Sequence, residues 1–164
     1  MENRFIFSSI PQNTDELLSL PEANLDSPCK TAALAMVALL KFETDPEMCY
    51  KMLDALRGPD PMTPFAKSFI KERINQKPYK VKSFFEGATP ENNYTPTTPY
   101  TITVSDNPYS FTEENWATIY VKSSGADSPR QIKLRKKPST GQWFINDICC
   151  LSDIRTPAAL DDWA

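Results

Sequence analysis

The sequence predicts an α+β fold in which an N-terminal helical half of three to four helices packs on a C-terminal antiparallel sheet of about four strands. Three observations support this prediction. Prolines mark helix starts in the first half, an apolar run gives that half a buried helix, and β-branched segments with short connections fill the second half. At 164 residues with 40% apolar content, residues 1–164 are interpreted as one domain with one sizeable core.

The helical half covers about residues 13–76, and its helices begin at a repeated sequence pattern. In Ser27-Pro28, Asp45-Pro46 and Thr63-Pro64, a short oxygen-bearing side chain precedes a proline. The side chain caps free N–H groups of the first turn, and proline suits the first helical position because it has no N–H to satisfy. The predicted helices span about 28–42, 46–56 and 64–75, with a shorter one at 14–20.

The helices differ in their expected burial. The first of the three contains the run TAALAMVALL and is apolar on nearly every side, so we expect it to be the central buried helix. That run is about half of what a bilayer requires, so no membrane segment is expected. The helix at 64–75 is expected to bury Phe65, Phe69 and Ile70 against the core.

The sheet half covers about residues 100–150. Short connections at 123–129 and 138–141 predict that the last three strands form an antiparallel meander. Alternation places Ile119 with Val121, and Ile132 with Leu134, on the face expected to pack on the helices. The opposite face would show Trp116, Thr118 and Tyr120 beside Gln131, Lys133 and Arg135. The strands are expected at 100–105, 116–122, 130–136 and 142–149.

A long loop at about 84–99 joins the two halves and belongs to a distinctive segment, residues 87–109. This segment contains four prolines and no lysine or arginine. Each proline removes a backbone donor and biases the preceding residue toward extended geometry, which excludes a helix. Its tyrosines and threonines also distinguish it from a flexible spacer. We interpret it as an ordered surface segment of the kind that more often serves recognition than packing.

The candidate recognition surface combines this segment with the neighbouring turn at 125–130. Short amides and phenols in a rigid loop offer donors and acceptors to a partner, and replacing Asn93 and Tyr94 by alanine should then remove partner binding without loss of stability. The alternative is that these side chains hold their own loop and turn backbones in place. The candidates are Asn92, Asn93, Tyr94, Tyr100, Asp106, Asn107, Tyr109, Asp127 and Arg130.

Charge is unevenly distributed along the chain. Residues 86–114 hold five acids and no base, whereas residues 115–138 hold six bases and one acid. The net charge of −3 gives no global attraction to nucleic acid or to an anionic membrane, so neither is expected as a partner. The basic strand face, with aromatic residues nearby, could still bind an anion or single-stranded nucleic acid. The alternative is that the acidic segment folds across this face and neutralises it.

The residue types disfavour catalysis. The chain has no histidine, which removes Ser-His and Cys-His nucleophiles and the commonest transition-metal ligand. Its four scattered glycines form no phosphate-binding loop, and no cofactor or metal motif is found. Carboxylate chemistry or oxygen ligation by Glu86, Glu91 and Asp106 stays open. The four cysteines are interpreted as reduced and structural, the alternative being an exposed redox-sensing thiol at Cys150.

Several strings carry a family resemblance. GATPENNYTPTTPYTITVSDNPYS, SSGADSPRQIKLR, GQWFIND and LSDIRTPAALDDWA resemble those of a family of small stand-alone proteins from Firmicutes bacteria, catalogued as a domain of unknown function. LPEANLDSPCKTAAL and LDALRGPDPMTPF fit the same family, so the resemblance spans nearly the whole chain. It implies a self-contained bacterial cytoplasmic domain and no particular activity. The order of elements and TGQWFI are also similar to nuclear-transport-factor-2-like cones, which implies a pocket between helices and sheet.

The sequence therefore predicts a cytoplasmic, non-enzymatic protein that recognises another protein, or a second copy of itself, through the 87–109 segment and the 125–130 turn. The alternative is a pocket protein that binds or converts a small molecule. The tail, residues 151–164, contains Trp163, which is expected to hold the tail against the body.

Overall fold

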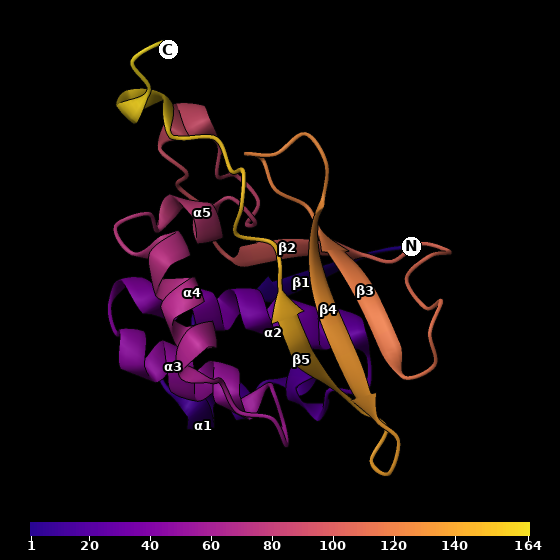
Figure 1. Ribbon diagram of the computed structural model, residues 1–164. Helices are drawn as coiled ribbons and strands as arrows, with labels where there is room; N and C mark the ends of the chain where they lie inside the picture. The colour runs from indigo at the N-terminus through magenta and orange to yellow at the C-terminus, as the bar shows by residue number, and fades with distance from the viewer.

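A computed structural model describes residues 1–164 and confirms the α+β class (Figure 1). One antiparallel sheet contains all five strands in chain order. The strands are β1 (Glu2–Phe7), β2 (Tyr100–Ser105), β3 (Trp116–Val121), β4 (Arg130–Lys137) and β5 (Gln142–Ile148). The helices are α1 (Thr14–Leu18), α2 (Pro28–Leu40), α3 (Pro46–Ala55), α4 (Pro64–Ile74) and α5 (Tyr79–Lys82).

The proline-marked helix starts are confirmed. The side chains of Ser27, Asp45 and Thr63 each accept a hydrogen bond from a backbone N–H two or three residues further on, at 3.1 to 3.2 Å. Each following proline is the first residue of its helix. Local sequence therefore determines where α2, α3 and α4 begin, because one side chain satisfies an otherwise unpaired N–H group.

Helix α2 occupies the inner face of the sheet, as expected for the most apolar helix. Nearly all of its side chains are buried, and it contacts all five strands. The inner-face residues of β3 and β4 predicted from alternation, such as Ile119 and Leu134, are fully buried. Thr31 Oγ1 donates a 2.7 Å hydrogen bond to the carbonyl of Trp143 and so joins α2 to β5. The inner face, where a cone-type fold would hold its pocket, is packed by α2.

The sheet has one strand more than predicted, because β1 pairs antiparallel with β2 along its whole length. Phe5 and Phe7 are more buried than their neighbours, whereas Ile6 is 56% exposed on the outer face. An apolar residue on the solvent side breaks the alternation that would mark a half-buried strand. The identity of β1 therefore depends on its long-range pairing with β2.

The outer edge of β5 is covered by loops. The backbone N–H of Trp143 donates to the carbonyl of Leu25, and that of Ile145 donates to the carbonyl of Leu56, both at 2.8 Å. Loop carbonyls thus occupy donors that would otherwise invite another strand. Recognition by strand addition is accordingly not favoured at this edge.

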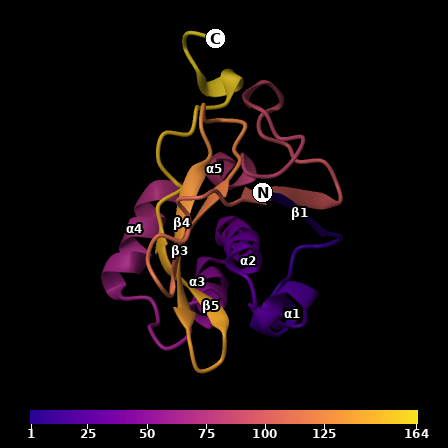
Figure 2. The same cartoon turned by 90° about the vertical axis from the view of Figure 1, so that its right-hand side faces the viewer.

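The outer face of β3 to β5 is open, and α4 lies beside β5. Figure 2 shows α2 and α4 on opposite sides of these strands.

Two side chains that were predicted to pack against the body are exposed in the structure. Phe65 of α4 is 79% exposed, because α4 turns Ile70 and Ile74 toward the core instead, and Trp163 is 95% exposed on the tail. No helix has both the length and the apolar character required to cross a membrane.

Candidate functional site

The predicted recognition loop uses its polar side chains internally at Asn92. Its Oδ1 accepts from the backbone N–H groups of Thr89 at 2.9 Å and Thr95 at 3.0 Å, and its Nδ2 donates to the Gly87 carbonyl at 2.6 Å. A reciprocal bond from Asn92 N to Thr89 Oγ1 completes a capping box around a short 3₁₀ helix. This geometry supports the alternative in which Asn92 holds its own loop.

Tyr94 is a core residue, which corrects its expected place on the surface. Its side chain is fully buried and its ring stacks on Tyr79 with centroids 5.7 Å apart. The hydroxyl donates a 2.6 Å hydrogen bond to the Arg155 carbonyl, and burial raises the pKa of the phenol. Asn93 is exposed and takes a left-handed φ of 58°, so it supplies the turn that directs Tyr94 inward.

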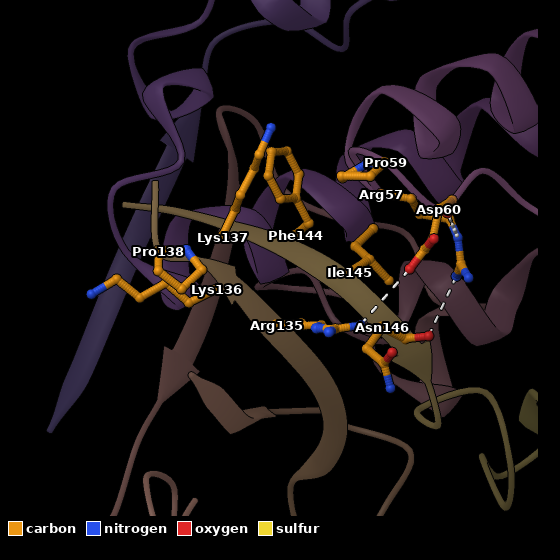
Figure 3. A pocket seen from close by; sticks show the side chains of 10 residues that line it. All are labelled: Arg57, Pro59, Asp60, Arg135, Lys136, Lys137, Pro138, Phe144, Ile145 and Asn146. Carbon is orange, nitrogen blue, oxygen red and sulfur yellow. Dashed lines mark hydrogen bonds and ion pairs between the residues drawn. The ribbon is translucent and has the colours of Figure 1, made fainter. Parts of the chain in front are cut away.

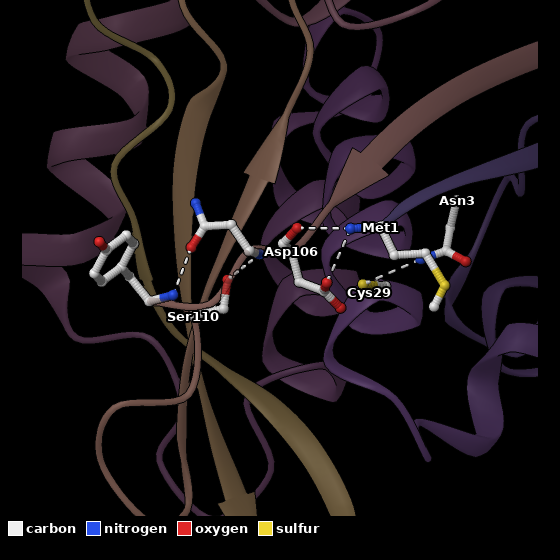
Figure 4. Close-up of polar contacts among 7 residues, drawn as sticks. Met1, Asn3, Cys29, Asp106 and Ser110 are labelled. Carbon is white, nitrogen blue, oxygen red and sulfur yellow. Dashed lines mark hydrogen bonds and ion pairs between the residues drawn. The ribbon is translucent and has the colours of Figure 1, made fainter.

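The other candidates of the 87–109 segment lie apart from one another. Tyr100 starts β2 and packs edge-on against Phe85. Figure 4 shows Asp106, whose carbonyl and carboxylate accept from the amino group of Met1 at 2.9 and 3.3 Å. Asn107 Oδ1 accepts from the backbone N–H of Tyr109, and the ring of Tyr109 is 76% exposed. Tyr109 is thus the most exposed of the aromatic candidates.

The 125–130 turn contacts the start of the tail. Asp127 pairs with Arg155 at 2.8 Å, and Arg130 Nη2 donates to the carbonyl of Asp153 at 3.0 Å, so these two candidates do not pair with each other. The carbonyl of Gly125 accepts from the Arg155 N–H at 2.9 Å. Together with Tyr94, the turn therefore fixes residues 153–155 against the body.

A different surface is built around a β-bulge at Asn146. Lys133 pairs with Asp147 and Leu134 pairs with Ile145, so Asn146 is one extra residue in β5. A bulge places two neighbouring side chains on one face, and both Asn146 and Asp147 are exposed on the outer face. The sequence signal for it is the break in alternation where the two polar residues follow Ile145.

Three hollows meet at Asn146 on the outer face. The first, about 340 Å³, lies between the β4–β5 hairpin and the loop after α3 (Figure 3). The second, about 410 Å³, runs between α4 and the end of β5 and shares Arg57 with the first. The third, about 330 Å³, lies between β3 and the loop before it. We call the three together the Asn146 groove.

One arm of the Asn146 groove is apolar. It is formed by the exposed side of α4 and the end of β5. Phe65 stands open to solvent, while Phe69 is half-buried with the guanidinium of Arg73 at 4.9 Å from its ring centre. Exposed apolar side chains that gather in one hollow mark a candidate interaction site. Phe65, Ala66 and Phe69 are the accessible apolar side chains, and the lining is completed by Met62, Ile70 and Ile148, which are buried.

The remaining arms of the Asn146 groove are polar and mainly basic. Arg57 lies at the junction, with Nε donating to the Asp60 carbonyl at 3.0 Å and Nη1 to the Asn146 carbonyl at 3.4 Å (Figure 3). Arg135 lies over the ring of Trp116, with Cζ 5.1 Å from the ring centre. The charged side chains are Arg57, Lys133, Arg135, Lys136 and Lys137, against Asp60, Glu113 and Asp147.

The acidic segment 86–114 does not neutralise the basic strand. Glu86 pairs with Arg4 at 2.9 Å, and this contact lowers the pKa of that carboxyl group. Asp106 pairs with the Met1 amino group, and no ion pair joins residues 86–114 to β4. Arg135 has one carboxylate partner, Asp60, at 4.0 Å. The basic arms therefore keep charge available for a ligand.

The thiols near the Asn146 groove are poor nucleophiles. Burial, followed by the charge of Asp147 and a hydrogen bond with it, raises the pKa of Cys149 to about 11. Cys150, the alternative redox-sensing thiol, is fully buried, and its pKa is raised by that burial. No group of three or more Cys, Asp or Glu side chains is placed to hold a metal ion. The arrangement suits binding better than thiol chemistry.

We predict that Asp147→Asn increases the reactivity of Cys149. Loss of the carboxylate removes two of the causes that raise the Cys149 pKa, so more thiolate is present at a given pH. Iodoacetamide labelling at mildly alkaline pH should be several-fold faster, measured by peptide mass spectrometry. Asp153→Asn, the same charge change at another exposed site, should leave the rate unchanged. Equal rates in both variants would contradict the proposed coupling.

Comparison with known proteins identifies the family. A family model described as Domain of unknown function (DUF6935) matches residues 9–158. The chain therefore belongs to this family, which agrees with the resemblance found in its proline- and asparagine-rich strings. No curated protein and no solved structure matches it.

Proposed function

We propose that the protein is a binding module whose Asn146 groove accepts a short segment of another protein. The segment would carry a large apolar side chain close to acidic residues. The observation that supports this proposal is that an apolar arm with exposed Phe65 meets, at Arg57, an arm in which basic side chains outnumber acidic ones. Apolar anchors provide affinity in such sites, and guanidinium groups select carboxylates.

A protein segment fits the Asn146 groove better than a small molecule does. Small-molecule sites enclose most of the ligand surface, whereas these three hollows are open and extend in different directions from one residue. An extended or turned segment can place successive side chains in successive hollows. The groove lies on regular elements, α4 and β5, which hold its side chains at fixed spacing.

This proposal moves the binding surface away from the segment predicted from sequence. In the 87–109 segment, Asn92 and Tyr94 make internal contacts, so their donors and acceptors are already used. That segment acts here as a support for the tail. A bacterial origin and a cytoplasmic location stay predictions from the sequence.

Selection from a random peptide display library against the full-length protein tests the proposed function. We expect the selected peptides to contain an aromatic or large aliphatic residue with Asp or Glu close by. Phe65→Ser should weaken their binding by roughly tenfold or more, since an anchor contact contributes at least 1–2 kcal/mol. Phe65 is exposed, so the variant should fold normally, which thermal melting checks.

Tyr109→Ser is the matched control, because it removes an exposed aromatic ring from the 87–109 segment instead. The proposal predicts that selected peptides bind this variant as they bind the wild type. Binding that is lost with Tyr109→Ser and kept with Phe65→Ser would overturn the groove and return recognition to the loop. Failure to select any peptide that depends on Phe65 would also count against it.

A further inference from the structure

We propose that the tail of a second copy of this chain, residues 158–164, is a ligand of the Asn146 groove. This inference rests on the proposed function and names the partner. The tail presents the chemistry that the groove requires. Leu160 and Trp163 supply apolar side chains, Asp161 and Asp162 supply carboxylates, and no basic residue accompanies them.

The apolar side chains of the tail are mostly exposed within their own chain. Trp163 is 95% exposed and Leu160 is 69% exposed, and both acids between them are exposed. The residues just before are fixed, because Ile154 is buried and the Arg155 carbonyl accepts from Tyr94. The tail therefore extends from a fixed base and presents an exposed tryptophan ring that is available to a partner.

The tail already contains turns before it binds. Residues Ala158–Leu160 form a 3₁₀ turn, and Trp163 N donates to Asp161 Oδ1 at 2.9 Å. The backbone N–H of Ala164 donates to the Asp161 carbonyl, which closes a second turn. These turns hold the apolar pair around the two acids, so less conformational entropy is lost on docking than for a disordered peptide.

Charge complementarity favours the tail as the occupant. Basic side chains outnumber acidic ones in the groove, and the tail segment carries two negative charges and no positive one. The groove bases are Arg57, Lys133, Arg135, Lys136 and Lys137, and its acids are Asp60, Glu113 and Asp147. The apolar arm beside Arg57 offers Phe65 and Phe69 to the tryptophan ring. Aromatic anchors flanked by charge pairs are the usual centre of such contacts.

The contact is expected between two molecules. Figures 1 and 2 both place the tail at the end of the molecule opposite the β4–β5 hairpin, and that hairpin borders the groove. The base of the tail is fixed through Arg155, and Ala158–Leu160 also contact Pro90–Asn92, so the tail is held away from the groove of its own molecule. Two copies that exchange tails form a closed dimer, and a one-way contact forms an open chain.

Sedimentation equilibrium of four full-length samples tests the inference. The wild type is expected to show a mass that rises with concentration above 18.6 kDa. A groove variant, Phe65→Ser with Arg57→Glu, and a tail variant, Leu160→Ser with Trp163→Ser, should each stay at 18.6 kDa. Their mixture should regain association, because the first supplies an intact tail and the second an intact groove. Added salt should weaken association, since the contact is partly ionic.

Several outcomes would overturn the tail as a ligand. These are a wild type that stays monomeric at all concentrations, a tail variant that associates like the wild type, or a mixture that shows no gain. If library-selected peptides still bind in a Phe65-dependent way, the proposed function stands and only the named partner falls. If they do not, both fall. Melting curves of each variant show whether the substitutions, all at exposed or half-exposed positions, disturb the fold.

Discussion

Replacing Tyr94 by alanine should destabilise the protein by about 3–5 kcal/mol, the range measured for loss of a large buried aromatic side chain. Tyr94 is fully buried, stacks on Tyr79 and donates to the Arg155 carbonyl. Alanine would leave a cavity and an unpaired Arg155 carbonyl, and it would remove a hydrogen bond that fixes the start of the tail. In a chain of this size the melting temperature should fall by roughly 6–20 °C, which calorimetry or denaturant unfolding measures.

Tyr94→Phe separates the two causes of this effect. The ring and its stacking are kept, while the hydrogen bond to Arg155 is lost, so we expect a cost of about 1 kcal/mol. Stability that is unchanged in Tyr94→Ala, together with lost partner binding, would contradict the buried position. That result would restore the recognition role first expected for this residue.

Arg57→Glu should lower the affinity for selected acidic peptides by roughly 100-fold or more, because like-charge contacts at an interface cost several kcal/mol. Arg57 lies where the apolar and basic arms meet, and Asp60 and Asp147 line the same hollows. Reversing its charge therefore makes the junction acidic. Fluorescence anisotropy of a labelled peptide measures the change at low and at high salt.

Lys51→Glu is the matched control for this charge reversal. Lys51 is exposed on α3 and lines none of the three hollows that form the groove. The same change in net charge at this site should alter affinity only slightly. Equal losses in the two variants would mean that overall charge, and not the groove, attracts the peptide.

Local sequence determines much of the fold. Helix starts at Ser27, Asp45 and Thr63 follow from side-chain caps, and the positions of β2 to β5 follow from short-range alternation. Strand β1 could not be assigned in this way, because Ile6 faces solvent and the strand exists through pairing with β2 about a hundred residues away. Hydrophobic patterning identifies elements, and long-range pairing decides where they lie.

The candidate site was harder to predict than the fold. Burial of Tyr94 depends on left-handed backbone at Asn93 and Tyr94 and on distant Arg155, and neither is visible in a string of prolines and asparagines. Phe65 is four residues before half-buried Phe69, but the core residues of α4 are Ile70 and Ile74, which lie on the other side of the helix, so Phe65 faces solvent. The Asn146 bulge had a visible signal, the adjacent polar pair inside an otherwise alternating strand.

Backbone amide chemical shifts, recorded while a library-selected peptide is added to ¹⁵N-labelled full-length protein, test the central claim most directly. The proposal predicts that the shifted amides cluster around Asn146 and Asp147 on β5, near Arg57 and along the exposed side of α4. Shifts confined to residues 87–109 and 125–130, with β5 and α4 unchanged, would show that the protein binds through its loop and that the Asn146 groove is not the site.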